Sequence, residues 1–212
     1  MKAFHNDPLI KEYYFNRLNK HYQADEVVKG QYWANGKGCA VGCTIHSSDH
    51  NKYESELGIP KNIAYLQDSI FESLPNKLAK QFPLEFLSAI KVGADLKNVK
   101  NLFTIWLLTD QKYGVLQYAK DKKIVQDIAD AFSRDMVSPV PSKEWEELKY
   151  NATAAYSDSK YDVYSAYSAA AYSVVYSVAA AYSVAASFVE NTKSEWNIAA
   201  SNKLIELLKN AN

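Results

Sequence analysis

Four residues of types that bind metals or attack substrates lie close together in this sequence. The stretch NGKGCAVGCTIHSSDH, residues 35–50, holds both cysteines of the chain and two of its four histidines. If residues 39–50 form one helix, Cys39, Cys43, His46 and His50 share one face, because they are spaced by four, three and four residues. This spacing resembles that of a zinc ligand set.

A straight helix cannot bring all four residues to one zinc ion. Cys39 and His50 would lie about 16 Å apart along the axis, whereas zinc ligands lie within about 2.3 Å of the metal. An adjacent pair can still share an ion, particularly if Gly42 breaks the helix. We therefore expect no metal and no other cofactor, with His46 and His50 as the alternative metal ligands.

The glycines of the same stretch offer a different site. Residues 35–38 are expected to form a turn before the helix, and such a turn presents backbone N–H groups and the positive end of the helix dipole. Lys37 adds a mobile charge, so the site would take a phosphate, a nucleotide or a carboxylate. Alternatively, the glycines only make a tight turn and the cysteines pack in the core. The predicted ligand-binding residues are Trp33, Asn35, Gly36, Lys37, Gly38, Cys39, Cys43 and His46.

A cysteine nucleophile is a third hypothesis. A helix N-terminus would stabilise the thiolate of Cys39, and a histidine could act as its base. His46 lies two turns away, so His5 or His21 would have to approach from the first helix instead. We favour a binding protein over an enzyme and assign no catalytic residue; Cys39 and His46 are the alternative catalytic pair.

The elements around this stretch are predicted to be helices. Asp7 and Pro8 are an N-cap followed by proline at the first helical position, opening a helix to about Val28. The pairs Ile59–Pro60 and Phe82–Pro83 are expected to open two more, and strand patterning is almost absent. Further helices are expected in the segments NLFTIWLL, KKIVQDIADAF and SEWNIAASNKLIELLKN, the first capped by Asp95. We expect an all-α protein.

Carboxylates on these helices are expected to face solvent. Asp68 and Glu72 are four residues apart and could pair for acid–base chemistry, but a solvated helix face is the simpler interpretation.

Two prolines divide the chain. Pro139 and Pro141 stop any helix, and Ser142 can cap the next one. We expect a helical globular domain over residues 1–138 and an Ala/Ser/Tyr-rich helical region over residues 142–212.

The second region contains a degenerate repeat without charge. No charged residue occurs between Asp162 and Glu190, and the tripeptide AYS recurs four times, at Ala155, Ala166, Ala171 and Ala181. The six serines and five tyrosines of this run argue against a membrane span. We expect one long helix or a helical hairpin that packs on residues 1–138 or on a second copy, which predicts a homo-oligomer.

Charge and composition exclude some classes of function. The 24 basic and 24 acidic residues balance, so the default is no nucleic-acid partner. The N-terminal residues have no apolar run of signal-peptide length, and two cysteines are too few for a secreted disulfide scaffold. A cytoplasmic protein is expected.

The motif resembles a family of uncharacterised open reading frames from phages and bacterial genomes. The shared pattern is GxGCxxGCxxH followed by an alanine-rich helical repeat, and Gly36, Gly38, Cys39, Gly42, Cys43 and His46 match it. The repeat here is richer in tyrosine and serine. The resemblance implies mobile-element or anti-defence biology in the cytoplasm of a host cell, but no established activity.

Two hypotheses of function follow. The first is a non-enzymatic protein that sequesters an anionic small molecule, such as a nucleotide-like signal, or blocks a host defence protein. The second is a cysteine- or metal-dependent enzyme that uses Cys39, Cys43, His46 and His50.

Overall fold

A computed structural model describes residues 1–119, 121–157, 178–188 and 193–212. These residues are mainly α-helical, with one two-stranded sheet, so the predicted all-α class is confirmed. They form two compact units, residues 1–99 with 200–212, and residues 100–199. The boundary expected at Pro139 and Pro141 falls inside the second unit.

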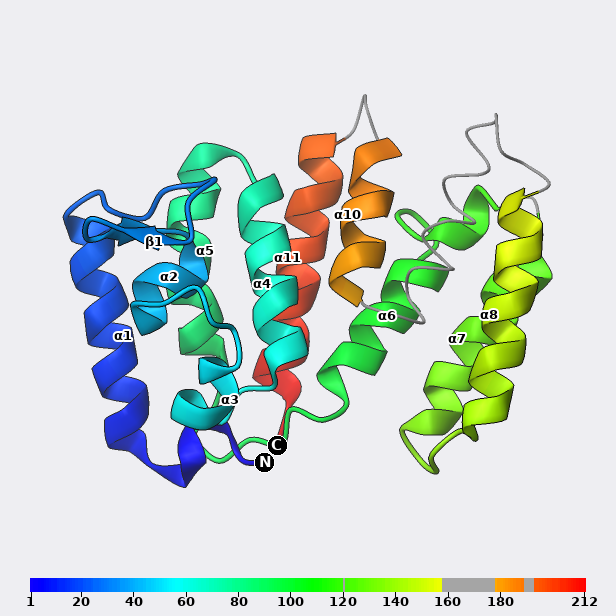
Figure 1. The fold of residues 1–212 in the computed structure, drawn as a ribbon, viewed down its shortest axis with the longest axis horizontal. Helices are drawn as coiled ribbons and strands as arrows, with labels where there is room; N and C mark the ends of the chain where they lie inside the picture. The colour runs from blue at the N-terminus through cyan, green and yellow to red at the C-terminus, as the bar shows by residue number, and fades with distance from the viewer. Residues whose placement is uncertain (120, 158–177, 189–192) are drawn as a thin grey trace. The chain divides into compact units, whose positions relative to one another are not determined.

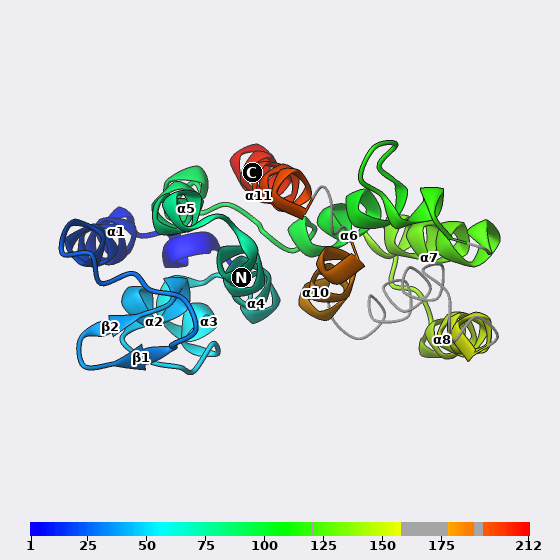
Figure 2. The ribbon, with the colours of Figure 1, turned by 90° about the horizontal axis from the view of Figure 1, so that it is seen from above.

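The first unit is a layer of helices with a hairpin on one side. Its helices α1, α5 and α4 lie side by side, and α2 packs against both α1 and α4 (Figures 1 and 2). The side chains of Leu18, Ile63, Leu66, Ile70 and Phe86 are fully buried in its core. The elements in chain order are η1 (Ala3–Asn6), α1 (Pro8–Gln23), β1 (Trp33–Ala34), β2 (Lys37–Gly38), α2 (Ala40–Ile45), α3 (Lys52–Leu57), α4 (Lys61–Ser73) and α5 (Asn76–Ala89).

Helix α1 begins as the sequence predicts. The carboxylate of Asp7 accepts a hydrogen bond from the N–H of Leu9 at 2.8 Å, and Pro8 is the first helical residue. The helix ends at Gln23, five residues before the expected end near Val28. The shorter helix leaves residues 24–28 to form the strand-like segment that pairs with Gly38.

The prediction that Phe82–Pro83 opens a helix is wrong. Helix α5 begins at Asn76 and continues through Pro83. Phe82, Pro83 and Phe86 are all buried, so packing on the core holds the chain helical where a proline removes one backbone hydrogen bond.

The cysteine-rich stretch forms a hairpin and one short helix. Asn35 and Gly36 both have positive φ (52° and 78°), as a two-residue hairpin turn requires. Lys37 belongs to β2 rather than to a turn. Helix α2 ends at His46, which adopts the left-handed conformation (φ 50°, ψ 42°), so the single helix expected from Cys39 to His50 is not formed.

The glycines of this stretch allow backbones to approach closely. A Cβ atom on Gly38 or Gly42 would lie 2.1 or 1.5 Å from the carbonyl oxygen of Tyr32. The segment before the hairpin therefore packs directly on α2, and this packing accounts for both glycines.

The second unit contains the helices after the 99–100 boundary. Helices α7 and α8 pack side by side, and the rings of Phe132 and Trp145 lie 4.8 Å apart (Figure 1). Asp121 caps α7, because its carboxylate accepts a hydrogen bond from the N–H of Ile124. Asp95 was expected to cap the helix through NLFTIWLL, but its carboxylate accepts from the N–H of Lys97, which precedes that helix. The elements are α6 (Val99–Thr109), η2 (Val115–Gln117), α7 (Lys122–Asp135), α8 (Ser142–Ser157), α10 (Val178–Phe188) and α11 (Lys193–Asn210), of which α6 and α11 each cross a unit boundary.

The predicted last helix is confirmed as α11, with Trp196, Leu204, Leu207 and Leu208 buried. The repeat around Ala166 and Ala171 lies outside the described residues, so the prediction of one long helix or a helical hairpin there stays a prediction.

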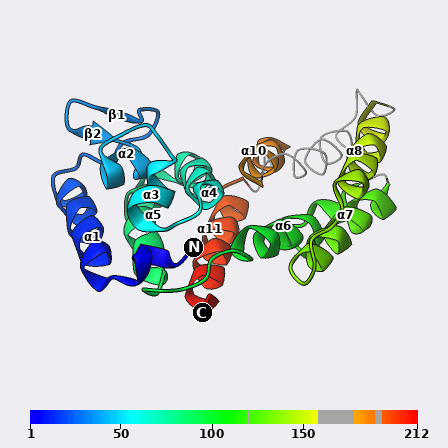
Figure 3. The same ribbon diagram turned by 60° about the horizontal axis from the view of Figure 1, so that its bottom comes forward.

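The two chain ends meet in the first unit (Figure 3). The N–H of Ala3 donates to the carbonyl of Ala94, and the N–H of Asp95 donates to the carbonyl of Asn212, at 3.0 and 2.9 Å. Residues 93–95 therefore fix both ends of the chain.

Among the helices that the structure describes, none has the length and apolar character needed to cross a membrane.

Candidate functional site

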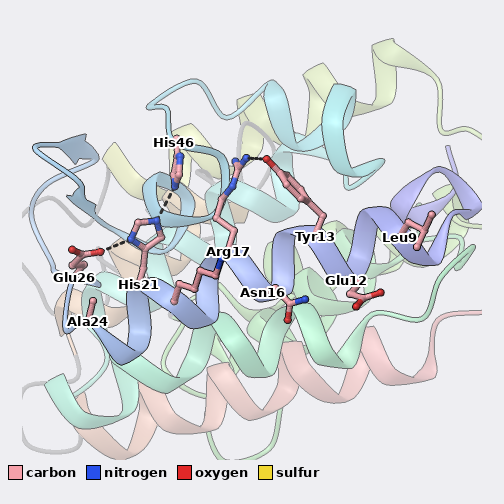
Figure 4. Close-up of a pocket in the computed structure, with 10 residues that line it drawn as sticks. Leu9, Glu12, Tyr13, Asn16, Arg17, His21, Ala24, Glu26 and His46 are labelled. Carbon is pink, nitrogen blue, oxygen red and sulfur yellow. Dashed lines mark hydrogen bonds and ion pairs between the residues drawn. The ribbon is translucent and has the colours of Figure 1, made fainter.

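An open groove of about 920 Å³ runs along α1 and reaches the end of α2 (Figure 4). Its α1 residues recur every three or four positions and therefore share one side of the helix. From Leu9 to Ala24 the groove is about 22 Å long, at 1.5 Å per residue. The lining residues are Leu9, Glu12, Tyr13, Asn16, Arg17, Lys20, His21, Ala24, Glu26 and His46.

Three side chains at one end of the groove form a hydrogen-bonded chain. The Nδ1 atom of His21 lies 2.7 Å from the carboxylate of Glu26, and its Nε2 atom lies 2.7 Å from Nε2 of His46. The ring of His46 stacks on the indole of Trp33, with centroids 4.3 Å apart and planes 10° from parallel. Because the carboxylate of Glu26 accepts, the Nδ1 atom of His21 donates this hydrogen bond.

The backbone positions each member of this chain. Helix α1 supplies His21, and the tight turn after it, with Asp25 at φ 57°, brings Glu26 back beside the helix. The N–H of Gly38 donates to the carbonyl of Glu26 at 3.1 Å, which holds that residue against the hairpin. His46 ends α2 in the left-handed conformation, and its side chain meets α1.

Arg17 connects α1 to the end of α2. Its Nη1 donates to the carbonyl of Thr44 at 3.2 Å, and its Nη2 donates to the hydroxyl of Tyr13. The guanidinium lies over the rings of Tyr13 and Tyr14, 4.6 and 5.1 Å from their centroids. Two of the five N–H groups of Arg17 are used in these bonds.

The cations of the groove gather toward one end. Arg17, His21 and His46 lie there together with the carboxylate of Glu26, whereas Glu12 lies beside Leu9 toward the other end (Figure 4). Lys20, one position before His21 on α1, also lines the groove. Partial desolvation of the ring, and then the positive charges of Arg17 and His21, lower the pKa of His46 below its ordinary value. The ring of His46 therefore favours its neutral form more than an ordinary histidine does.

A second cluster of polar side chains lies inside the first unit. His50 is 4% exposed, Asp68 is 9% exposed, and Tyr53 and Gln67 are fully buried. The Nε2 atom of His50 lies 3.7 Å from the carboxylate of Asp68, and its Nδ1 donates to the carbonyl of Ser48. Asp68 was expected on a solvated face; instead, the turn before α3 covers it.

Much of this interior cluster is unpaired. In the described part of the chain, five of its buried atoms lack a hydrogen bond of good geometry: His50 Nε2, Tyr53 Oη, Gln67 Nε2 and Oε1, and Asp68 Oδ1. Tyr53 still lies close to the side chains of Thr44 and Gln67, and Asp68 lies close to the Cys39 thiol. Buried polar groups are nearly always hydrogen-bonded. The half-exposed rings of Tyr32 and Tyr65 cover His50, the first edge-on and the second stacked at 4.1 Å.

The structure separates the residues predicted from the cysteine-rich stretch. Trp33 and His46 come together beside His21. Asn35, Gly36 and Lys37 lie in the exposed hairpin, whereas Gly38, Cys39 and Cys43 are buried. The first turn of α2 is buried too, so its N–H groups do not face solvent.

Neither cysteine is placed as a nucleophile. Burial and the nearby Asp68 carboxylate raise the pKa of the Cys39 thiol. Burial raises the pKa of Cys43 to about 12, and its thiol donates to the carbonyl of Gly38 at 3.2 Å. Both thiols are protonated at neutral pH, and His21, suggested as a base for Cys39, contacts His46 instead.

The alternative metal pair is also divided. His46 contacts His21 and Trp33, whereas His50 contacts Asp68 and two tyrosines. Within the described ranges, no group of three or more His, Cys, Asp or Glu side chains is arranged to hold a metal ion.

The groove residues on α1 were not predicted as a ligand site, and only His21 was considered, as a base for Cys39. Lys20 and His21 follow Arg17 by three and four residues, so the three side chains share one face of the helix. That spacing was the available signal. Nothing in the sequence shows that Glu26 and His46, which follow on other segments, meet this face.

Compared with protein-family models, with curated proteins and with solved structures, the chain has no match.

Proposed function

We propose that this protein binds a small anionic molecule in the groove along α1. The observation that carries the proposal is a pair of cations, Arg17 and Lys20, at the His46 end of the groove. Across the described chain, no carboxylate forms an ion pair with either of them. The charge of Glu26, in contrast, is already engaged by His21.

The donors at this end suit a phosphate or carboxylate group. Arg17 is held in place by Thr44 and Tyr13, so little side-chain freedom is lost when its remaining N–H groups bind an anion. Lys20 adds a flexible charge one turn further along α1. Charge-assisted hydrogen bonds of this kind each contribute roughly 1.5–3 kcal/mol.

The shape of the groove favours an elongated ligand. Leu9, Tyr13 and Ala24 supply apolar surface, and 920 Å³ is in the range of pockets that hold nucleotide-sized molecules. A nucleotide-like signal, the ligand class expected from the sequence, would fit this combination of apolar surface and cations. ATP is therefore a suitable first probe, with pyrophosphate and citrate as smaller anions.

The test is a calorimetric titration of the full chain with ATP, pyrophosphate and citrate at low ionic strength. We expect at least one of these anions to bind, and Arg17→Gln and Lys20→Gln each to weaken it by about tenfold or more, since each variant removes a charge–anion contact. Lys37→Gln is the matched control, because this exposed lysine lies in the hairpin.

The control also separates two locations for the site. A loss of affinity in Lys37→Gln, with Arg17→Gln and Lys20→Gln unchanged, would move the site to the glycine turn. Absence of binding by all three anions would refute the proposal. Circular dichroism of each variant establishes that it is folded.

A further inference from the structure

We infer that anion binding in the α1 groove is coupled to the uptake of one proton by the ring of His46, which lies against His21. This inference rests on the proposed function and concerns its regulation. It makes the protein a binder that holds its ligand more tightly as the pH falls through the neutral range.

The geometry limits the number of protons that the pair can hold. The two Nε2 atoms are 2.7 Å apart, so a single proton fits between them. Since Glu26 accepts from Nδ1 of His21, one added proton leaves the hydrogen bond between the rings in place, and only a pair in which both rings are charged would place two N–H groups against each other. That state loses the hydrogen bond between the rings.

The charges that face His46 act in the same direction. From α1 it meets Arg17 and His21, with Lys20 on the same groove wall. From the hairpin it meets only the uncharged ring of Trp33. Glu26 is hydrogen-bonded to His21, which lies between it and His46. Glu12 lies toward the other end of the groove (Figure 4).

An anion beside Arg17 and His46 changes this balance. Its negative charge offsets the positive charges that oppose protonation of His46. By linkage, a ligand that favours the protonated form binds more tightly when protons are more abundant.

The test is calorimetry of ATP binding between pH 6 and 7.5 in buffers of low and high ionisation enthalpy, which yields the number of protons taken up. The number of protons taken up is compared between wild type and His46→Gln. Protons that bind to the phosphates of ATP contribute equally to both numbers, so they cancel in the difference. His5→Gln is the control, since His5 contacts the carbonyl of Ser55 outside the groove.

We expect wild type and His5→Gln to take up more protons than His46→Gln, by as much as one per ATP. Their affinity should rise by up to tenfold per pH unit as the pH falls. Equal proton numbers in wild type and His46→Gln, with ATP bound by both, would overturn the coupling and leave the proposed function standing. If wild type binds none of ATP, pyrophosphate and citrate, both fail.

Discussion

The side-chain amide of Gln67 is buried in the first unit, and no described residue meets either of its polar atoms with good hydrogen-bond geometry, although the hydroxyl of Tyr53 lies nearby. A buried group in this state costs about 1–3 kcal/mol. Methionine has a similar length and no strong hydrogen-bonding group. We therefore expect Gln67→Met to raise the free energy of unfolding by about 1 kcal/mol or more, measured by urea denaturation.

Gln126 provides the matched control. It is exposed on α7 and its amide donates to Asp130 at 2.8 Å, so Gln126→Met should change stability by less than about 0.5 kcal/mol. Destabilisation by Gln67→Met would instead show that the interior amide is engaged, and that the cluster with Asp68 is satisfied in solution.

Asp68 also shows where residue patterns stop being informative. Its spacing from Glu72 places both on one side of α4, but Asp68 is buried beside His50 whereas Glu72 is exposed and accepts from the N–H of Gly30. The difference depends on which loop covers each residue. Helical periodicity carries no such information.

At the scale of elements, α2 packs directly on the segment before the hairpin at Gly42. Among the glycines, this is the one at which an added Cβ atom would lie nearest to another atom. A Cβ atom on Gly42 would lie 1.5 Å from the carbonyl oxygen of Tyr32, and a backbone atom cannot rotate away. We expect Gly42→Ala to lower the free energy of unfolding by about 2–3 kcal/mol, as an overpacked core substitution does. Thermal and urea denaturation measure this loss.

Gly36→Ala is the comparison. Nothing lies within 4 Å of a Cβ atom there, so only the positive φ of 78° opposes the substitution, at about 1–2 kcal/mol. If Gly36→Ala proved the more damaging of the two, strain in the turn rather than close packing would dominate this stretch.

Helix starts with local signals were predicted well, and helix ends poorly. Asp7 is a cap that acts within its own turn, and α1 begins where this residue predicts. Helix α7 begins with the predicted segment KKIVQDIADAF, where the structure adds Asp121 as its cap. The end of α2 depends on His46 adopting a left-handed conformation that contacts with α1 support. Pro83 misled the prediction because tertiary packing outweighed a local preference.

At the scale of the molecule, the groove joins segments that are distant in sequence. Arg17 and His21 belong to α1, and His46 comes 25 residues after His21. The sequence predicted His46 and Trp33 as site residues, but the contacts of His46 with α1 depend on how α2 packs against that helix. Clustering along the chain drew attention to Cys39 and Cys43, which the fold buries.

Stability should depend on pH through His46. Because its pKa in the folded state lies below the ordinary value of 6.5, the unfolded chain binds a proton first as the pH falls. The free energy of unfolding therefore decreases from about pH 6.5 down to the folded pKa, and is unaffected by this group at higher pH. We expect His46→Gln to flatten this decrease in denaturation series between pH 7.5 and 5.5.

His5→Gln should leave the decrease unchanged, since His5 lies outside the groove. A series for His46→Gln that parallels wild type would assign the pH dependence to other groups.

The stack of Trp33 on His46 gives the groove a built-in optical signal. The rings are 4.3 Å apart and nearly parallel, close enough for the excited indole to transfer an electron to the imidazole. A protonated imidazole accepts that electron more readily than a neutral one. The emission of Trp33 is therefore expected to dim when His46 gains a proton, so the fluorescence of this one indole reports the state of the groove.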